Sequence, residues 1–211
     1  THPLTDFSNG LTSAVEKGGA STLVVDARKR YPGSGIAYAE DLVLTADHVV
    51  TREDELKVLL PDGKSLSATV AGRDPGSDLA LLRLAEKVLT PAKTSSDVKV
   101  GQLVLALGRP NSAGMQASWG IVTAIAGPAR THRGGLLDEY IQTETTPYPG
   151  FSGGPLVNTE GEVLGLNTSG LTRGSSLTIP VKGAWRIAEA LAKHGSVKRG
   201  YLGVRTQPAE I

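Results

Sequence analysis

The sequence predicts an all-β fold of two six-stranded antiparallel Greek-key barrels with a C-terminal helix. Glycine is frequent, at 26 of 211 residues, and 12 prolines add further turn positions, so the chain is divided into many short elements. Strand-like apolar segments fall into two groups on either side of a stretch, residues 87–101, that has few large apolar side chains. A single strong helical periodicity follows them near the C-terminus.

The first half of the chain predicts an N-terminal arm and the first barrel. Residues 1–19 fit a short amphipathic helix or arm that ends at Gly18-Gly19. Residues 20–86 then contain the first group of strands, and the sequence PDGK between two of them is typical of a hairpin turn. The predicted strands are 21–27, 36–40, 41–45, 55–60, 65–74 and 79–84.

The second half predicts a connector, the second barrel and a helix. Residues 87–101 are the connector, and residues 102–181 hold the second group of strands, one pair of which is joined by the short loop TEG. The helix at 182–195 has apolar residues spaced at i, i+3, i+4 and i+7 and ends at Gly195. The predicted strands are 102–108, 117–127, 140–146, 154–158, 162–168 and 175–181.

Composition excludes several classes of function. The net charge of +1 offers no basic surface for nucleic acid. There are no cysteines, which excludes disulfides and thiolate chemistry, and the four histidines lack the spacing of a metal site. We therefore expect no metal and no cofactor. No apolar run is long enough for a membrane span, and the chain opens without a leader, so we expect any export signal to have been removed.

Ser152 is the first candidate for a chemical role, because it lies in the glycine-rich sequence GFSGG. This string satisfies the G-x-S-x-G pattern of α/β-hydrolases, in which a helix follows the serine and the acid and histidine come later. Here a strand pattern follows instead, and no aspartate occurs after Ser152. An α/β-hydrolase esterase is therefore disfavoured.

His48 and Asp78 complete the alternative order of His, Asp and Ser. A serine hydroxyl needs a base to take its proton, and an imidazole held by a carboxylate suits that task. His48 directly follows the apolar strand of LVLTADHVV, and Asp78 precedes the apolar strand LALLRL. Asp47 is a rival acid only because it is adjacent to His48, and its side chain is expected to diverge.

Several segments together resemble the HtrA/Deg family of serine proteases, which have the chymotrypsin-like fold. The similar segments include LTADHVV, DPGSDLALLRL, PGFSGGPLVN and GEVLGLNTSG, and the resemblance covers roughly residues 10–205. It implies a serine endopeptidase that cleaves unfolded or damaged polypeptides through an acyl-enzyme. His48 would be the general base, Asp78 the orienting acid and Ser152 the nucleophile, in a cleft between the barrels.

The same resemblance implies an oxyanion hole formed by the backbone N–H groups of Gly150 and Ser152. Phe151 departs from the family, which usually has asparagine at this position. A phenylalanine cannot pair with a newly cut N-terminus, so activation by N-terminal cleavage is not expected. The sequence TTPYPG also differs from the small and polar residues usual in the family, so we expect the loop 145–151 to have more than one state. The alternative function is therefore a catalytically impaired binding module or chaperone.

Substrate recognition, by the same analogy, involves four residues: Thr146, six positions before the nucleophile, and Thr168, Ser169 and Gly170 on the strand that would pair with the substrate backbone. None is charged, so we expect a small or medium apolar residue before the scissile bond. The N-terminal arm would form a homotrimer, or else pack on its own chain. Residues 196–211 resemble the junction to a PDZ domain, and the family implies a periplasmic or envelope location.

Overall fold

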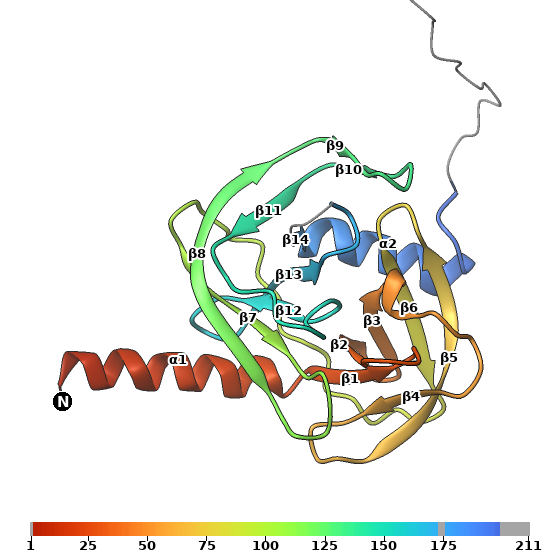
Figure 1. The fold of residues 1–211 in the computed structure, drawn as a ribbon, viewed down its shortest axis with the longest axis horizontal. Coiled ribbons are helices and arrows are strands. Elements are labelled where there is room, and N and C mark those ends of the chain that lie inside the picture. Colours follow the sequence, from red (N-terminus) through yellow and green to blue (C-terminus); the bar gives the residue numbers. More distant parts are fainter. Residues whose placement is uncertain (1, 173–175, 199–211) are drawn as a thin grey trace, which may run out of the picture.

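Two closed six-stranded barrels lie beside each other in the computed structural model, which describes residues 2–172 and 176–198 (Figure 1). The first barrel consists of β1 (Thr22–Asp26), β2 (Gly33–Ala39), β3 (Leu42–Ala46), β4 (Leu56–Leu59), β5 (Ser65–Asp74) and β6 (Leu79–Leu84). The second consists of β7 (Leu103–Gly108), β8 (Gln116–Ala126), β11 (Tyr140–Thr143), β12 (Pro155–Val157), β13 (Val163–Thr168) and β14 (Leu177–Pro180). Helix α1 (Pro3–Gly19) precedes the barrels and α2 (Val181–His194) follows them. The predicted fold class is confirmed.

Both barrels have the same connectivity. The first has the strand order β1-β2-β3-β6-β5-β4, in which β6 returns to pair with β3. The second has the order β11-β14-β13-β12-β7-β8, in which β14 returns to pair with β11. A fourth strand that returns beside the first of its set is the Greek-key arrangement. All of these pairings are antiparallel, as the glycine-rich turns predicted.

Aliphatic side chains from the strands form the core. Strand β6 is buried at five of its six positions, because α2 covers its outer face as well as that of β5. The helix presents Ala184, Ile187, Ala188 and Leu191 to this surface, and all four are buried. The apolar periodicity in the sequence therefore predicted the correct face of α2. A smaller cluster fills part of the second barrel and includes Phe151.

Helix α1 extends away from the barrels over most of its length (Figure 1). Only Ala14, Gly18 and Gly19 are buried, all toward its C-terminal end. Near the other end Phe7 is exposed, and its ring packs edge-on against Trp119 with the centroids 6.1 Å apart. The helix thus contacts the second barrel through a few residues and leaves apolar side chains exposed.

The structure differs from the sequence-based prediction in three places. Strand β2 begins at Gly33, before the predicted start at residue 36. Two short strands, β9 (Ala129–Arg130) and β10 (Leu136–Leu137), form a separate hairpin that the sequence did not predict, because two residues are too short for a periodic pattern. Strand β11 ends at Thr143, so the segment that follows is a loop. Of the expected PDZ junction, residues 199–211 lie outside the described part.

Candidate active site

His48 lies where the first barrel's strand β3 ends. A short 3-10 helix, η1 (Asp47–Val49), follows β3 directly. The side chains on either side of His48 are buried, whereas its own imidazole is 18% exposed. The chain thus turns off the sheet as the sequence predicted, and it presents the ring at the barrel surface with limited access to solvent.

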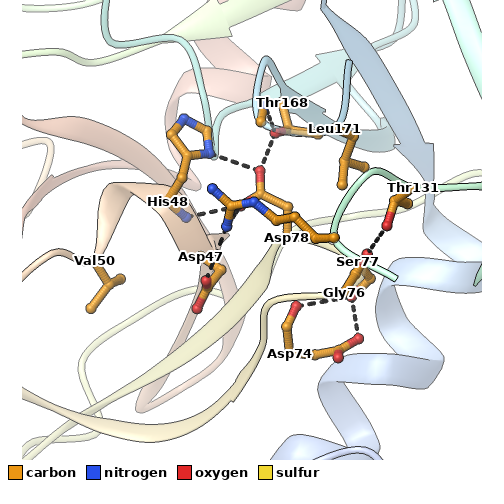
Figure 2. Close-up of polar contacts among 12 residues, drawn as sticks. Asp47, His48, Val50, Asp74, Gly76, Ser77, Asp78, Thr131, Thr168 and Leu171 are labelled. Carbon is orange, nitrogen blue, oxygen red and sulfur yellow. Dashed lines mark hydrogen bonds and ion pairs between the residues drawn. The ribbon is translucent and has the colours of Figure 1, made fainter. Parts of the chain in front are cut away.

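Asp78 lies directly before β6 and is fully buried. Its φ of +56° is left-handed, a conformation that non-glycine residues seldom adopt and that aspartate tolerates better than most. Its carbonyl accepts a hydrogen bond from the Asp47 N–H at 2.9 Å, which ties this loop to η1. The backbone thereby directs the Asp78 carboxylate toward His48 (Figure 2).

The two residues are joined by two hydrogen bonds. The His48 backbone N–H donates to Asp78 Oδ1 at 2.8 Å, and His48 Nδ1 lies 2.7 Å from Asp78 Oδ2. Because an ionised carboxylate can only accept, Nδ1 carries the proton and Nε2 is left with a free lone pair. This is the tautomer that a general base requires.

Surrounding residues keep the Asp78 carboxylate ionised. Burial alone would raise its pKa, but hydrogen bonds and charge from His48, together with a hydrogen bond from the Thr168 hydroxyl, outweigh it and lower the pKa. Gly170 packs directly on the pair: a Cβ there would lie 2.3 Å from Asp78 Oδ2 and 2.6 Å from His48 Nδ1. Thr168 and Gly170, which were predicted to bind substrate, therefore lie against the acid and base.

Ser152 follows a tight turn of the second barrel. The Phe151 N–H donates to the Tyr148 carbonyl at 3.1 Å, and Gly150 has a φ of +87°. Proline at the second position and a left-handed glycine at the third are typical of a type II turn. The Ser152 hydroxyl lies 3.1 Å from the Ser169 hydroxyl and accepts from the Ser169 N–H at 3.3 Å. Within residues 2–172 and 176–198 it makes no hydrogen bond to His48.

A cleft of about 240 Å³ brings the predicted residues together. Its lining includes His48, Gly150, Ser152 and Ser169. The Gly150 carbonyl is held by the Ser34 hydroxyl at 2.7 Å. The N–H groups of Gly150 and Ser152 have no acceptor within the described part of the chain, so both donors are available to a bound group.

Phe151 anchors the turn instead of pairing with a charged group. Its ring is buried, and its centroid lies 5.4 Å from that of Tyr148 in an edge-on contact. Gly108 leaves the space for it, because a Cβ there would lie 2.3 Å from Phe151 Cδ1. The ring thus belongs to the core of the second barrel, which fixes the residue between Gly150 and Ser152.

A second cavity of about 230 Å³ adjoins this cleft, and the described residues that line it are all uncharged. Pro147, Phe151 and Ser176 line both spaces. Thr146, which was predicted to line the substrate pocket, is exposed and lies outside both linings, although its neighbours Thr145 and Pro147 belong to the second cavity. Counting six positions back from the serine gives a place in the chain but not the direction in which the side chain points.

Two arginines near the pair escaped the sequence analysis. Arg73 donates to Asp47 Oδ1 at 2.7 Å, and Arg133 lies 3.5 Å from Asp47 Oδ2 and 3.7 Å from Asp78 Oδ1. Asp47 thus diverges from the His48 ring and pairs with arginines, as expected for a residue that is not the catalytic acid. Arg133 comes from a loop 55 or more residues away in sequence, so no local pattern could have revealed it.

In residues 2–172 and 176–198, no three His, Cys, Asp or Glu side chains cluster in a way that could hold a metal ion. Neither helix in this part of the chain is both long and apolar enough to cross a membrane. These two findings add no further residues to the site.

Sequence comparison places the chain among serine endoproteases. Residues 33–166 match the family model of the trypsin-like peptidase domain. A probable periplasmic serine endoprotease DegP-like of Halomonas elongata is 41% identical over 189 residues, which cover 85% of this chain and 39% of that protein. A protein with the same name from Pseudomonas putida is 41% identical over 183 residues, which cover 83% of this chain and 38% of that protein. The chain therefore spans less than half the length of these relatives.

Comparison with solved structures also finds proteases of this kind. A serine endoprotease from Yersinia pestis matches with a TM-score of 0.78 and 30% identity, over 92% of this chain and 71% of that one. The HtrA-type protease AlgW with a tripeptide matches with a TM-score of 0.79 and 30% identity, over 90% of this chain and 66% of that one. The chain therefore belongs to the trypsin-like peptidase domain family and, within it, to the HtrA/DegP-like serine endoproteases.

Proposed function

We propose that the protein is a serine endopeptidase in which His48 is the general base, Asp78 the orienting acid and Ser152 the nucleophile. The observation that supports this most strongly is the double hydrogen bond between His48 and the buried Asp78, in a cleft that Ser152 also lines. A carboxylate buried at such a position costs free energy unless it is paired. Its pairing with an imidazole at an accessible cleft is an arrangement suited to proton transfer.

The reaction proceeds through an acyl-enzyme. Ser152 turns its hydroxyl from Ser169 toward His48, a rotation about one side-chain bond that is fast in exposed residues. As Oγ bonds to the substrate carbonyl carbon, His48 Nε2 takes its proton, and the carbonyl oxygen becomes an oxyanion. His48 then gives this proton to the leaving amine as the C–N bond breaks. Water, deprotonated by His48, hydrolyses the ester by the same route.

The N–H groups of Gly150 and Ser152 hold the oxyanion in this proposal. The hydrogen bond from Ser34 to the Gly150 carbonyl supports it, because it fixes the peptide plane on the far side of Gly150. The left-handed φ of Gly150 further defines the direction of its own N–H. Removal of one such donor typically costs about 10² to 10³ in kcat.

The proposed substrates are unfolded or damaged polypeptides with a small or medium apolar residue before the scissile bond. The uncharged residues that line the cavity beside the cleft support this preference, because none of those in the described part of the chain is a carboxylate that could pair with lysine or arginine. The substrate backbone pairs with the edge at Ser169–Gly170, as an added strand. Thr168 is fully buried, and its hydroxyl donates a hydrogen bond to Asp78.

Location and assembly are proposed from the relatives and from one surface feature. The relatives are named periplasmic, and we propose the same envelope location here, with residues 196–211 leading toward a PDZ domain. The exposed side chains of Leu4, Phe7 and Trp119 support homotrimer formation through α1, because clustered exposed apolar residues mark contact surfaces.

Proteolysis of denatured casein tests the proposed function. We expect the wild type to degrade it, with cuts after small or medium apolar residues when the products are sequenced by mass spectrometry. Ser152→Ala should leave casein intact while keeping the wild-type circular dichroism spectrum. An equally active Ser152→Ala would exclude Ser152 as nucleophile, and dominant cutting after lysine or arginine would contradict the apolar preference.

The alternative is a catalytically impaired binding module or chaperone. The hydrogen bonds of the Ser152 hydroxyl to Ser169 favour it, because they direct the nucleophile away from its base. A wild type that suppresses casein aggregation but cleaves no peptide bond would establish this alternative.

A further inference from the structure

The loop between β9 and β10, residues 131–135, joins the second barrel to the Asp78 loop of the first. The Thr131 hydroxyl donates to the Gly76 carbonyl at 2.7 Å (Figure 2). The same hydroxyl accepts from the Gly135 N–H at 3.0 Å. A Cβ on Gly135 would lie 2.1 Å from the Gly76 oxygen, so the two backbones are in direct contact. Gly76, the residue contacted, lies two positions before Asp78 in the sequence.

This loop places one guanidinium between two buried carboxylates. Arg133 Nη1 lies 3.5 Å from Asp47 Oδ2 and 3.7 Å from Asp78 Oδ1. The Asp47 and Asp78 side chains are 4% and 0% exposed, whereas that of Arg133 is 33% exposed. Asp47 already has Arg73 as a partner at 2.7 Å. Among the described residues, the cations that pair with Asp78 are Arg133 and, when it is protonated, His48.

The charge of Arg133 therefore affects the two forms of His48 differently. With His48 neutral, Arg133 stabilises the Asp78 carboxylate. With His48 protonated, Asp78 pairs with the imidazolium, and Arg133 adds a second positive charge nearby, which disfavours that form. We infer that Arg133 is a positioning residue that keeps Asp78 ionised and extends to lower pH the range in which His48 is free to act as the base. The inference rests on the proposed function.

Other charged or titratable groups around Asp78 come from each neighbouring element. Beyond Asp47, His48 and Arg133, they are Arg73 and Asp74 on β5, Glu53 through its ion pair with Arg73, and His132 in the 131–135 loop. His132 Nδ1 lies 3.1 Å from the Leu171 carbonyl, and Asp74 accepts from the Ser77 hydroxyl. Of these, Arg73 provides a matched control, because it contacts Asp47 as Arg133 does but is not ion-paired with Asp78.

The test is the rate constant for labelling of Ser152 by a fluorophosphonate, measured against pH. Its rise with pH reports the deprotonation of the base in the free enzyme. For Arg133→Gln, we expect the midpoint of this rise to lie about 0.5 to 1 pH unit higher, because solvent screening reduces the full effect of a charge at this distance. Below the midpoint the fraction of deprotonated base falls tenfold for each pH unit by which the midpoint rises, so labelling there slows by about three- to tenfold. The alkaline plateau should change little.

Controls separate this role from a structural one. Arg133→Lys should restore the wild-type midpoint in large part, and Arg73→Gln should lower the thermal midpoint of unfolding without moving the labelling profile. A uniform loss of rate in Arg133→Gln at every pH, or an equal displacement of the profile in Arg73→Gln, would overturn the inference.

Two further arms keep the outcome interpretable. If Arg133→Gln does not fold, Thr131→Val takes its place, because it removes the hydroxyl that holds the loop to Gly76. It should move the pH profile of labelling in the same direction by a smaller amount. An unmoved profile then refutes the role of Arg133. A wild type that is not labelled at any pH defeats the proposed function instead, whereas normal labelling with an unchanged Arg133→Gln profile defeats only this inference.

Discussion

The two barrels differ in how they hold their residues of the candidate site. The first barrel holds His48 and Asp78 in contact through two short hydrogen bonds, with the carboxylate fully buried. The second barrel presents Ser152 after a turn, with its hydroxyl bonded to Ser169. The acid and base are thus held together by burial and hydrogen bonds, whereas within the described residues the nucleophile is hydrogen-bonded to a neighbouring serine and not to the base. Changes to the acid, the base or the nucleophile should therefore remove activity, and changes to the residues that hold them in place should lower activity or stability.

Asp78→Asn, a change in the first barrel, should have the largest effect on activity. The amide cannot hold His48 in the required tautomer, so kcat/KM should fall by about 10⁴. Steady-state cleavage of a peptide, with circular dichroism to confirm folding, measures this. Asp47→Asn is the control, because its carboxylate contacts arginines instead of the imidazole; a similar loss in both variants would mean that the rate loss does not depend on the contact of Asp78 with His48.

Phe151→Ala tests how firmly the nucleophile turn is anchored. The side chain is 2% exposed and belongs to the second barrel's core, so its removal should cost about 3 to 5 kcal/mol of unfolding free energy. Urea denaturation gives this value. Tyr148→Ala, which removes the exposed partner ring, should cost less. Equal small losses would show that the turn is not held by the core.

Gly170→Ala tests the packing of the second barrel on the acid and base. A methyl group would overlap both Asp78 and His48, and a displacement of about 1 Å can cost about 10² in rate. Gly183→Ala is the matched control, since a Cβ there meets nothing within 4 Å. Its activity should equal that of the wild type. Full activity in Gly170→Ala would show that the acid and base tolerate movement.

The loss of stability when Asp78 is protonated at acid pH should be the smallest of these effects. The pKa of Asp78 is lowered in the folded state, through His48 and Thr168 acting against burial. Its contribution is therefore present above the unfolded value of about 3.9 and is lost as the pH falls through the folded value. The urea midpoint of the wild type should approach that of Asp78→Asn as the pH falls below about 4. A constant difference over this range would contradict the assignment.

The sequence predicted the local features of the site better than its long-range contacts. His48 and Asp78 could be found because each borders an apolar strand, and α2 because its periodicity is strong. Arg133 and the hairpin that carries it could not, because its two strands are too short to leave a pattern. Thr146 and Thr168 were assigned to substrate binding from their places in the chain, which do not tell where a side chain points: Thr146 is exposed, and the Thr168 hydroxyl donates to Asp78.

The most direct test of the central claim, that His48 and Asp78 activate Ser152, is mass spectrometry of the intact protein after reaction with a fluorophosphonate. We expect a single adduct that peptide mapping assigns to Ser152, and its loss in both Ser152→Ala and His48→Ala. An unmodified wild type, or an adduct that persists in His48→Ala at the same rate, would contradict it.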